Sequence, residues 1–182
     1  MSAEGGFNLK KSFALLLIAA VTLFAAANGA EAQMQAFSSQ EGRFAIQLPG
    51  APQYIPSDVP LTGSNTVVKL HQFAVEVGDT MAFITSYADY PASLVSGQVP
   101  DKVLQNVAKG SIADRQVLAE GVTSINGNAG RYYVAQGSDG LVFQARIYLV
   151  GTRLYQNIVV SDAASRARPE VRQFFDSFQL LK

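Results

Sequence analysis

The sequence contains no cysteine and only one histidine among its 182 residues. Without cysteine the chain can form no disulfide bond, thiolate zinc site or cysteine-linked lipid anchor, so its stability must come from its core alone. The single histidine, His71, cannot supply the paired histidines of a zinc site. No H-x-x-x-H or D-x-D-x-D spacing occurs either, so the sequence predicts no metal site and no cofactor.

The chain also lacks an excess of charge of either sign. Its 14 Lys and Arg residues balance its 14 Asp and Glu residues, which gives a formal net charge of +0. Nothing in this balance steers the protein toward nucleic acid or an anionic membrane. The phosphate-binding patterns G-x-x-x-x-G-K-[ST] and G-x-G-x-x-G are absent, so nucleotide chemistry is not supported.

Residues 1–32 have the pattern of a secretory signal peptide. Lys10 and Lys11 precede an apolar run from Phe13 to Ala27, and Ala30-x-Ala32 is a small-x-small cleavage site. The run is shorter than the roughly 20 residues that a membrane-spanning helix needs. The sequence therefore predicts cleavage between Ala32 and Gln33 and an exported protein, periplasmic or secreted. Residues 33–182 contain no second run long enough to span a membrane.

Residues 33–182 have the length of a single domain. Alternating apolar residues predict a first hairpin over 37–48, with its turn at 40–43, and a second over 66–90. Between them, the proline-rich stretch 49–65 is predicted to be a long loop. Gly78-Asp79 is expected to form a two-residue turn, which would place His71 opposite Ser86 and Val77 opposite Thr80.

The second half of the chain alternates between helical and strand patterns. A helix is predicted over 99–119, four strands over 117–160 with turns at Asn126-Gly127 and Gly151-Thr152, and a helix over 168–181 with an aromatic face. Tight turns favour an antiparallel sheet. The predicted fold class is α+β, an antiparallel sheet sandwiched by helices.

Four stretches carry a resemblance to a known family: FSSQEGRFAIQLPGAP, SYADYP, GRYYVAQ…RIYLVGTRLYQNIVV and FFDSFQL. Together they resemble the PsbP-like domains, which are related to an extrinsic photosystem II subunit and share a fold with the Ran-binding protein of nuclear transport. The resemblance extends from Phe37 to Leu180, and its motifs are structural. It implies an α/β/α sandwich and a non-enzymatic role, with divalent-metal binding in the photosynthetic members. Lipidated members carry a cysteine at the cleavage site, where this chain has Gln33.

The hairpin around Gly151 contains the main candidate site. A two-residue turn places Tyr148 opposite Tyr155 and Arg146 opposite Asn157, because directly paired residues share a face of the sheet. Tyr and Arg are favoured at binding hot spots, so these residues are candidates for a ligand or partner surface. Alternatively, the two tyrosines are a cross-strand pair that stabilises the sheet beneath a helix.

A candidate rim lies at the stretch TSYADYP, where Tyr87, Asp89 and Tyr90 precede Pro91. Proline keeps the preceding residue out of the helical region and ends the pairing of the strand, so a strand exit explains the motif without any ligand. A Ser–His pair from Ser86 and His71 would lack an identified acid and oxyanion hole, so no catalytic residues are predicted. A weak surface cation site from Asp79, Asp89 or Asp139 remains open.

Two functions follow as hypotheses. The first is an exported, non-catalytic module that binds a protein partner or assists a complex of the cell envelope. It predicts an exposed patch of tyrosine and apolar side chains, with the loop over 49–65 as its candidate place. The second is a small-ligand or divalent-metal binding protein with a pocket between sheet and helix, near Arg146 and Tyr148.

Intact mass spectrometry of the exported protein tests the cleavage site. We expect the mass of residues 33–182, because a signal peptidase accepts the Ala30-x-Ala32 site. The mass of the full chain would show that the N-terminal segment is retained.

Overall fold

A computed structural model describes residues 33–61 and 65–182; the predicted signal peptide and its cleavage site lie outside this range. The strands are β1 (Gln35–Ser39), β2 (Phe44–Leu48), β3 (Gln53–Pro60), β4 (Val67–Val77), β5 (Met81–Asp89), β6 (Gln116–Ile125), β7 (Asn128–Gln136), β8 (Val142–Val150), β9 (Arg153–Ser161) and β10 (Gln179–Leu180). The helices are α2 (Ala92–Val95), α3 (Pro100–Ser111) and α4 (Pro169–Asp176), with a 3-10 turn at Ser165–Ala167.

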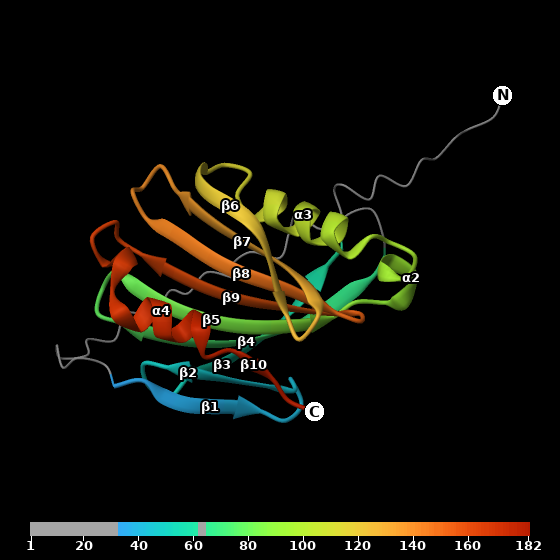
Figure 1. The fold of residues 1–182 in the computed structure, drawn as a ribbon, viewed down its shortest axis with the longest axis horizontal. Coiled ribbons are helices and arrows are strands. Elements are labelled where there is room, and N and C mark those ends of the chain that lie inside the picture. Colours follow the sequence, from blue (N-terminus) through green and yellow to red (C-terminus); the bar gives the residue numbers. More distant parts are fainter. Residues whose placement is uncertain (1–32, 62–64) are drawn as a thin grey trace.

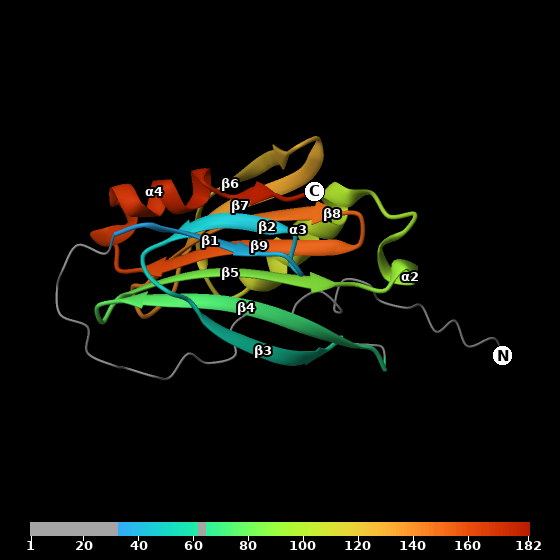
Figure 2. The ribbon, with the colours of Figure 1, turned by 90° about the horizontal axis from the view of Figure 1, so that it is seen from below.

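Seven of these strands form one antiparallel sheet in the order β3-β4-β5-β9-β8-β7-β6. The other three, β1, β2 and β10, form a small sheet. Figure 1 shows α3 on one side of the large sheet and α4 on the other, with β1 and β2 on the α4 side. The hairpin formed by β1 and β2 overlies the middle strands of the large sheet (Figure 2). The fold class is α+β, as the sequence predicts.

Each face of the large sheet is covered by its own apolar cluster. On the α3 face, Leu104 and Val107 of the helix pack with strand residues such as Ile147 and Leu154. On the α4 face, α4 and the small sheet of β1, β2 and β10 together cover the large sheet. This face is therefore covered by strands as well as by a helix.

The cluster on the α4 face is rich in aromatic rings. Phe174 of α4 is fully buried and meets Phe83 of β5 in a T-shaped contact, with ring centroids 5.4 Å apart. The ring of Phe178, just after α4, stacks on Tyr148 at 5.7 Å. Phe44 of β2 contacts Tyr87, Tyr155 and Phe178. These contacts join β2, α4 and the residue Phe178 to strands β5, β8 and β9 of the large sheet.

The predicted loop over 49–65 is only partly correct, because residues Gln53–Pro60 form strand β3, which pairs with residues 67–74 of β4. The prolines that suggested a loop, Pro56 and Pro60, lie on the outermost strand of the sheet. A strand at the edge needs hydrogen bonds on one side only, so it tolerates residues without an N–H group.

The predicted register of the second hairpin is wrong by one residue. The turn contains three residues, Gly78, Asp79 and Thr80, and Val77 pairs with Met81, so His71 lies opposite Tyr87 instead of Ser86. This register brings Phe73, Val75 and Val77 of β4 onto the same α4 face as Phe83 and Tyr87 of β5. A buried face fixes the register of a strand more strongly than the preference of a short turn does.

The other predicted turns are confirmed. Ser39 pairs with Phe44 across the first turn, Ile125 with Asn128, and Val150 with Arg153. Strand β5 ends at Asp89 and α2 begins three residues later, so TSYADYP is a strand exit. The two predicted helices are shorter than expected, and Phe178 lies beyond the end of α4 while still belonging to the aromatic cluster.

Replacing Phe174 with alanine tests the importance of the aromatic cluster. We expect the free energy of unfolding to fall by about 3–5 kcal/mol, because a fully buried ring is replaced by a cavity. Urea unfolding followed by circular dichroism measures this loss. Phe37→Ala, which removes a half-buried ring of the same cluster, should cost clearly less; equal losses would contradict this assignment.

Candidate binding site

A groove lies beside α4, where the sheet extends beyond the helix. Its volume is about 420 Å³ and it is open to solvent. The lining residues come from β6, β7, β8 and α4: Val122, Thr123, Tyr132, Tyr133, Val134, Gln144, Ala145, Arg146 and Phe175. This position agrees with the predicted pocket between sheet and helix near Arg146.

The floor of the groove is built from a row of paired residues on the α4 face. Tyr132 of β7 lies directly opposite Gly121 of β6 on one side and Arg146 of β8 on the other. The Tyr132 ring covers Gly121 so closely that a Cβ atom there would lie 2.7 Å from a ring carbon. Any side chain at position 121 would therefore displace the tyrosine that forms the floor.

Arg146 connects this floor to the end of α4. Its Nη1 atom lies 2.9 Å from Oδ1 of Asp176 and donates a hydrogen bond of 3.3 Å to the carbonyl oxygen of Phe175. The guanidinium carbon lies 5.2 Å from the centre of the Phe175 ring. A cation beside the last carbonyl groups of a helix stabilises its C-terminus. Arg146 thus positions α4, and about a third of its side chain remains exposed.

The other three residues of the predicted surface are buried. The predicted register is confirmed, since Tyr148 pairs with Tyr155 and Arg146 with Asn157. However, Tyr148 is 4% exposed, Tyr155 3% and Asn157 0%. The Tyr155 hydroxyl donates to the carbonyl oxygen of Gly42 at 2.7 Å, and Asn157 Oδ1 accepts a bond from Thr85 at 2.7 Å. Burial raises the pKa of both tyrosines.

Tyr148 and Tyr155 therefore join the sheet to its covering layer, and Asn157 bonds within the sheet. Of the four predicted residues, only Arg146 reaches the groove. Tyr132 and Phe175 line it, although sequence reasoning did not select them. The spacing GRYYV could have indicated Tyr132, but only once the pairing of β7 with β8 was known.

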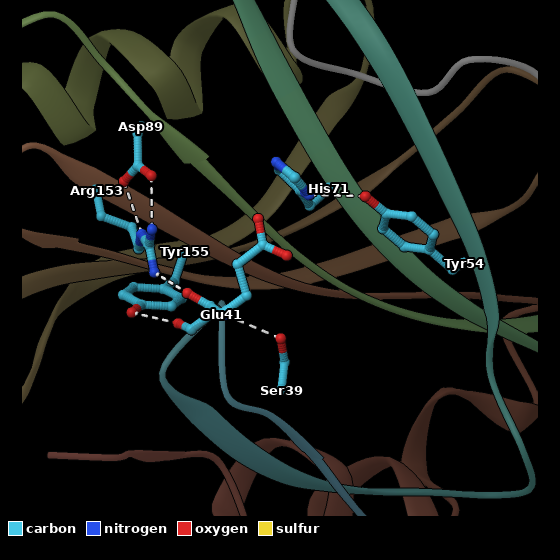
Figure 3. Close-up of polar contacts among 8 residues, drawn as sticks. Ser39, Glu41, Tyr54, His71, Asp89, Arg153 and Tyr155 are labelled. Carbon is cyan, nitrogen blue, oxygen red and sulfur yellow. Dashed lines mark hydrogen bonds and ion pairs between the residues drawn. The ribbon is translucent and has the colours of Figure 1, made fainter.

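The candidate rim residues Tyr87, Asp89 and Tyr90 lie at the far end of the same sheet. Asp89 receives two hydrogen bonds from Arg153, one of them 2.7 Å long from Nε. Arg153 also donates to the carbonyl oxygen of Glu41 at 2.8 Å and lies 4.5 Å from the centre of the Tyr87 ring. Figure 3 shows how these contacts tie the β1–β2 turn to β5 and β9.

Burial affects all three rim residues to different extents. Tyr87 is 1% exposed, and burial, helped by the nearby Glu41 carboxylate, raises its pKa to about 12. Tyr90 is 4% exposed and burial also raises its pKa. Only Asp89 is well exposed, and its hydrogen bond from Arg153 lowers its pKa. The rim is thus one exposed ion pair above buried tyrosine rings.

His71 belongs to this end of the sheet. Its ring stacks on that of Tyr87, with centroids 4.4 Å apart and planes 6° from parallel, and its Nδ1 lies 2.8 Å from the Tyr54 hydroxyl (Figure 3). Ser86 lies next to Tyr87 along β5, so its side chain points to the opposite face of the sheet from His71. The two residues therefore form no Ser–His pair.

The three candidate cation ligands lie in separate parts of the fold: Asp79 in the β4–β5 turn, Asp89 at the end of β5, and Asp139 in the β7–β8 turn. Asp139 Oδ1 accepts a hydrogen bond from the Leu141 N–H at 3.0 Å. Within residues 33–61 and 65–182, no three or more His, Cys, Asp or Glu side chains form a group that could hold a metal ion. Nor does this part of the chain contain a helix long and apolar enough to cross a membrane.

Large exposed apolar side chains gather at the β6 end of the sheet. In the described part of the chain, seven large apolar residues are well exposed, and four of them lie on β6 and β7. They are Val117 at 45%, Leu118 at 41%, Val122 at 70% and Tyr132 at 39%. Single exposed apolar residues are common, but a group beside a groove is typical of an interaction site.

Comparison with solved structures identifies the fold. The chain is similar to the solution structure of cyanobacterial PsbP (CyanoP) from Synechocystis sp. PCC 6803, with a TM-score of 0.53 and 14% sequence identity. The match covers 87% of this chain and 98% of that protein. PA94, a protein of unknown function from Pseudomonas aeruginosa, matches with a TM-score of 0.42 and 14% identity over 73% of this chain and 85% of its own.

No protein-family model and no curated protein matches the sequence. The likeness to cyanobacterial PsbP is one of fold, since the identity is low. The chain has a PsbP-like fold, as the resemblance of its sequence motifs implies.

Acid titration of the Asp89→Asn variant tests the ion pair with Arg153. Because the folded-state pKa of Asp89 is lowered, its stabilising effect is present above the ordinary aspartate pKa of about 3.9 and is lost as the pH falls through the lower folded value. Asp89→Asn should therefore destabilise the protein at pH 6, by less than about 1 kcal/mol for this exposed pair. The difference from the unmodified protein should shrink toward pH 3.

Urea unfolding between pH 6 and pH 3 measures this difference. In an Arg153→Met background, Asp89→Asn should leave the pH dependence unchanged, since the partner is already absent. A persistent effect of Asp89→Asn in that background would assign the lowered pKa to other groups.

Proposed function

We propose that the protein is an exported, non-catalytic PsbP-like module that binds a protein partner of the cell envelope through the β6–β7 hairpin and the adjacent groove. The observation that carries this proposal is the group of exposed Val117, Leu118, Val122 and Tyr132 at one end of the sheet. Burying these side chains against a partner would remove apolar surface from water, which is the main driving force of association.

The groove adds the residue types that dominate binding energies. Tyr132 and Arg146 lie on adjacent strands, and the Phe175 ring forms the opposite wall. Aromatic and arginine side chains at the centre of an interface contribute most when neighbouring contacts exclude water. Of the exposed apolar residues on the hairpin, Val122 also lines the groove and is placed to provide such a neighbouring contact.

A non-catalytic role is supported by the contacts of the ionisable side chains that are candidates for catalysis, because these side chains are already paired with other residues of the protein. His71 is stacked on Tyr87 and bonded to Tyr54, and Asp89 is paired with Arg153. The export step rests on the signal-peptide pattern of residues 1–32, and the absence of cysteine suits a domain that needs no particular redox compartment.

A second candidate function is the binding of a small ligand in the same groove. A volume of about 420 Å³ suits a small organic molecule, and Gln144 and Arg146 provide polar groups at its floor. Two features favour the protein partner. The groove is open instead of enclosed, and the Arg146 charge is already matched by Asp176.

Site-specific photo-crosslinking in the producing cell tests the proposed function. With a photoreactive amino acid in place of Leu118, we expect a covalent adduct with a partner protein, and Val122→Asp should reduce its yield at least tenfold. Val67→Asp is the matched control, because Val67 is an exposed valine at the other end of the sheet. It should leave the adduct unchanged.

Both aspartate variants should keep the stability of the unmodified protein within about 0.5 kcal/mol, because both positions are on the surface. The absence of any adduct at position 118, or an equal loss in both variants, would contradict binding at this hairpin.

A further inference from the structure

The two edges of the large sheet differ in how they are protected. At one edge, β3 contains Pro56 and Pro60, which have no N–H group to offer, and the charged Asp58 between them. At the other edge, the ten residues of β6 contain no proline and one charged residue, Glu120. Proline and charge are the usual means of preventing a free edge from pairing with another strand. The chain thus blocks one edge and leaves the other open.

Strand β6 is also regular enough to act as a template. Its one irregularity is a bulge between Val117 and Ala119. From Ala119 to Ile125 every residue has a direct partner on β7, so the backbone groups on the outer side form an unbroken row. In the described part of the chain no other strand pairs with this side of β6.

The two faces of β6 present different side chains to an incoming strand. Ala119, Gly121 and Thr123 alternate on the groove face, and all three are small. Glu120 and Val122 alternate on the α3 face, where Glu120 makes no ion pair with any described residue. Because Gly121 has no side chain, the Tyr132 ring lies directly over β6, where a side chain of a neighbouring strand could contact it.

We infer that the partner contributes an extended segment that adds to β6 as an eighth strand of the sheet. This inference rests on the proposed function and specifies the chemistry of the partner. The backbone of the segment bonds to the outer side of Ala119–Ile125. One of its large apolar side chains lies opposite Gly121 and packs on the Tyr132 ring at the edge of the groove. On the other face a lysine or arginine lies beside Glu120.

A second copy of this chain fits the edge less well. A ten-residue strand is about 34 Å long and a sheet with its side chains is about 10 Å thick. Two rigid copies meeting edge to edge would each bury on the order of 350 Å², whereas a stable specific interface buries about 800 Å² on each partner. A flexible segment can also send side chains into the groove and over Val122, which a rigid β6 edge cannot do.

The register of crosslinks along β6 tests this inference. A small diazirine amino acid is placed, one position at a time, at Ala119, Glu120, Val122, Thr123 and Ser124 in the full-length gene. The crosslinked partner peptides are then sequenced by mass spectrometry. A strand added antiparallel gives pairs in which the two residue numbers have a constant sum, and a parallel strand gives a constant difference. We expect one of these relations at all five positions.

The outcomes separate this inference from the proposed function. Adducts that scatter over several segments of the partner, or follow helical spacing, would overturn strand addition. They would still support the proposed function, the binding of a protein partner at the β6–β7 hairpin. Adducts with a second copy of this chain in that register would overturn the assignment of the occupant. The absence of adducts at all five positions would overturn both proposals.

A charge-reversing variant checks the basic residue proposed beside Glu120. Glu120→Lys should lower the adduct yield at Val122 at least threefold by placing like charges side by side. Glu76→Lys, at an exposed position on β4, is the matched control and should leave the yield unchanged. An unchanged yield with Glu120→Lys would overturn the assignment of a basic partner residue.

Discussion

The need to cover both faces of the seven-stranded sheet governs the rest of the structure. Seven strands spaced about 4.8 Å apart extend over about 29 Å, and one helix about 10 Å across covers little more than two of them. On the α4 face the eight-residue helix therefore shares its task with β1, β2 and β10. The hydrogen bonds from Tyr155 and Arg153 to the β1–β2 turn fix this second layer in place.

The same geometry explains where a binding surface can exist. On the α4 face the covering layer lies over the middle strands, so residues in the centre of that face, such as Tyr148 and Asn157, are buried. The sheet continues beyond α4 to β6, and the groove opens there on this face. The open edge of β6 and the exposed apolar residues of its hairpin are consequences of a sheet that is wider than the layers that cover it.

The sequence predicted the parts of the structure that depend on near neighbours. Glycine-containing turns at 126–127 and 151–152 gave the correct register, and helical spacing of Val171, Phe174 and Phe175 identified the buried side of α4. The prediction from the Gly78 turn failed because the packing of Val75 of β4 with Phe83 and Tyr87 of β5 on one face determined the register. For the candidate site, only Arg146 was predicted correctly as a lining residue, while Tyr132 and Phe175 were missed because their proximity depends on the pairing of distant strands.

By itself, the sequence determined the α+β class, most of the strands, both long helices and the PsbP-like character of the fold. The class, the strands and the helices arise from turn chemistry and from alternation or helical spacing, which act within a few residues, and the PsbP-like character is implied by the resemblance of four sequence stretches to that family. Only the tertiary structure decided that residues 53–60 form a strand, that the paired tyrosines Tyr148 and Tyr155 are buried, and that β6 is the open edge. Burial and strand order depend on which distant segments meet, and that information is not contained in any local stretch of the chain.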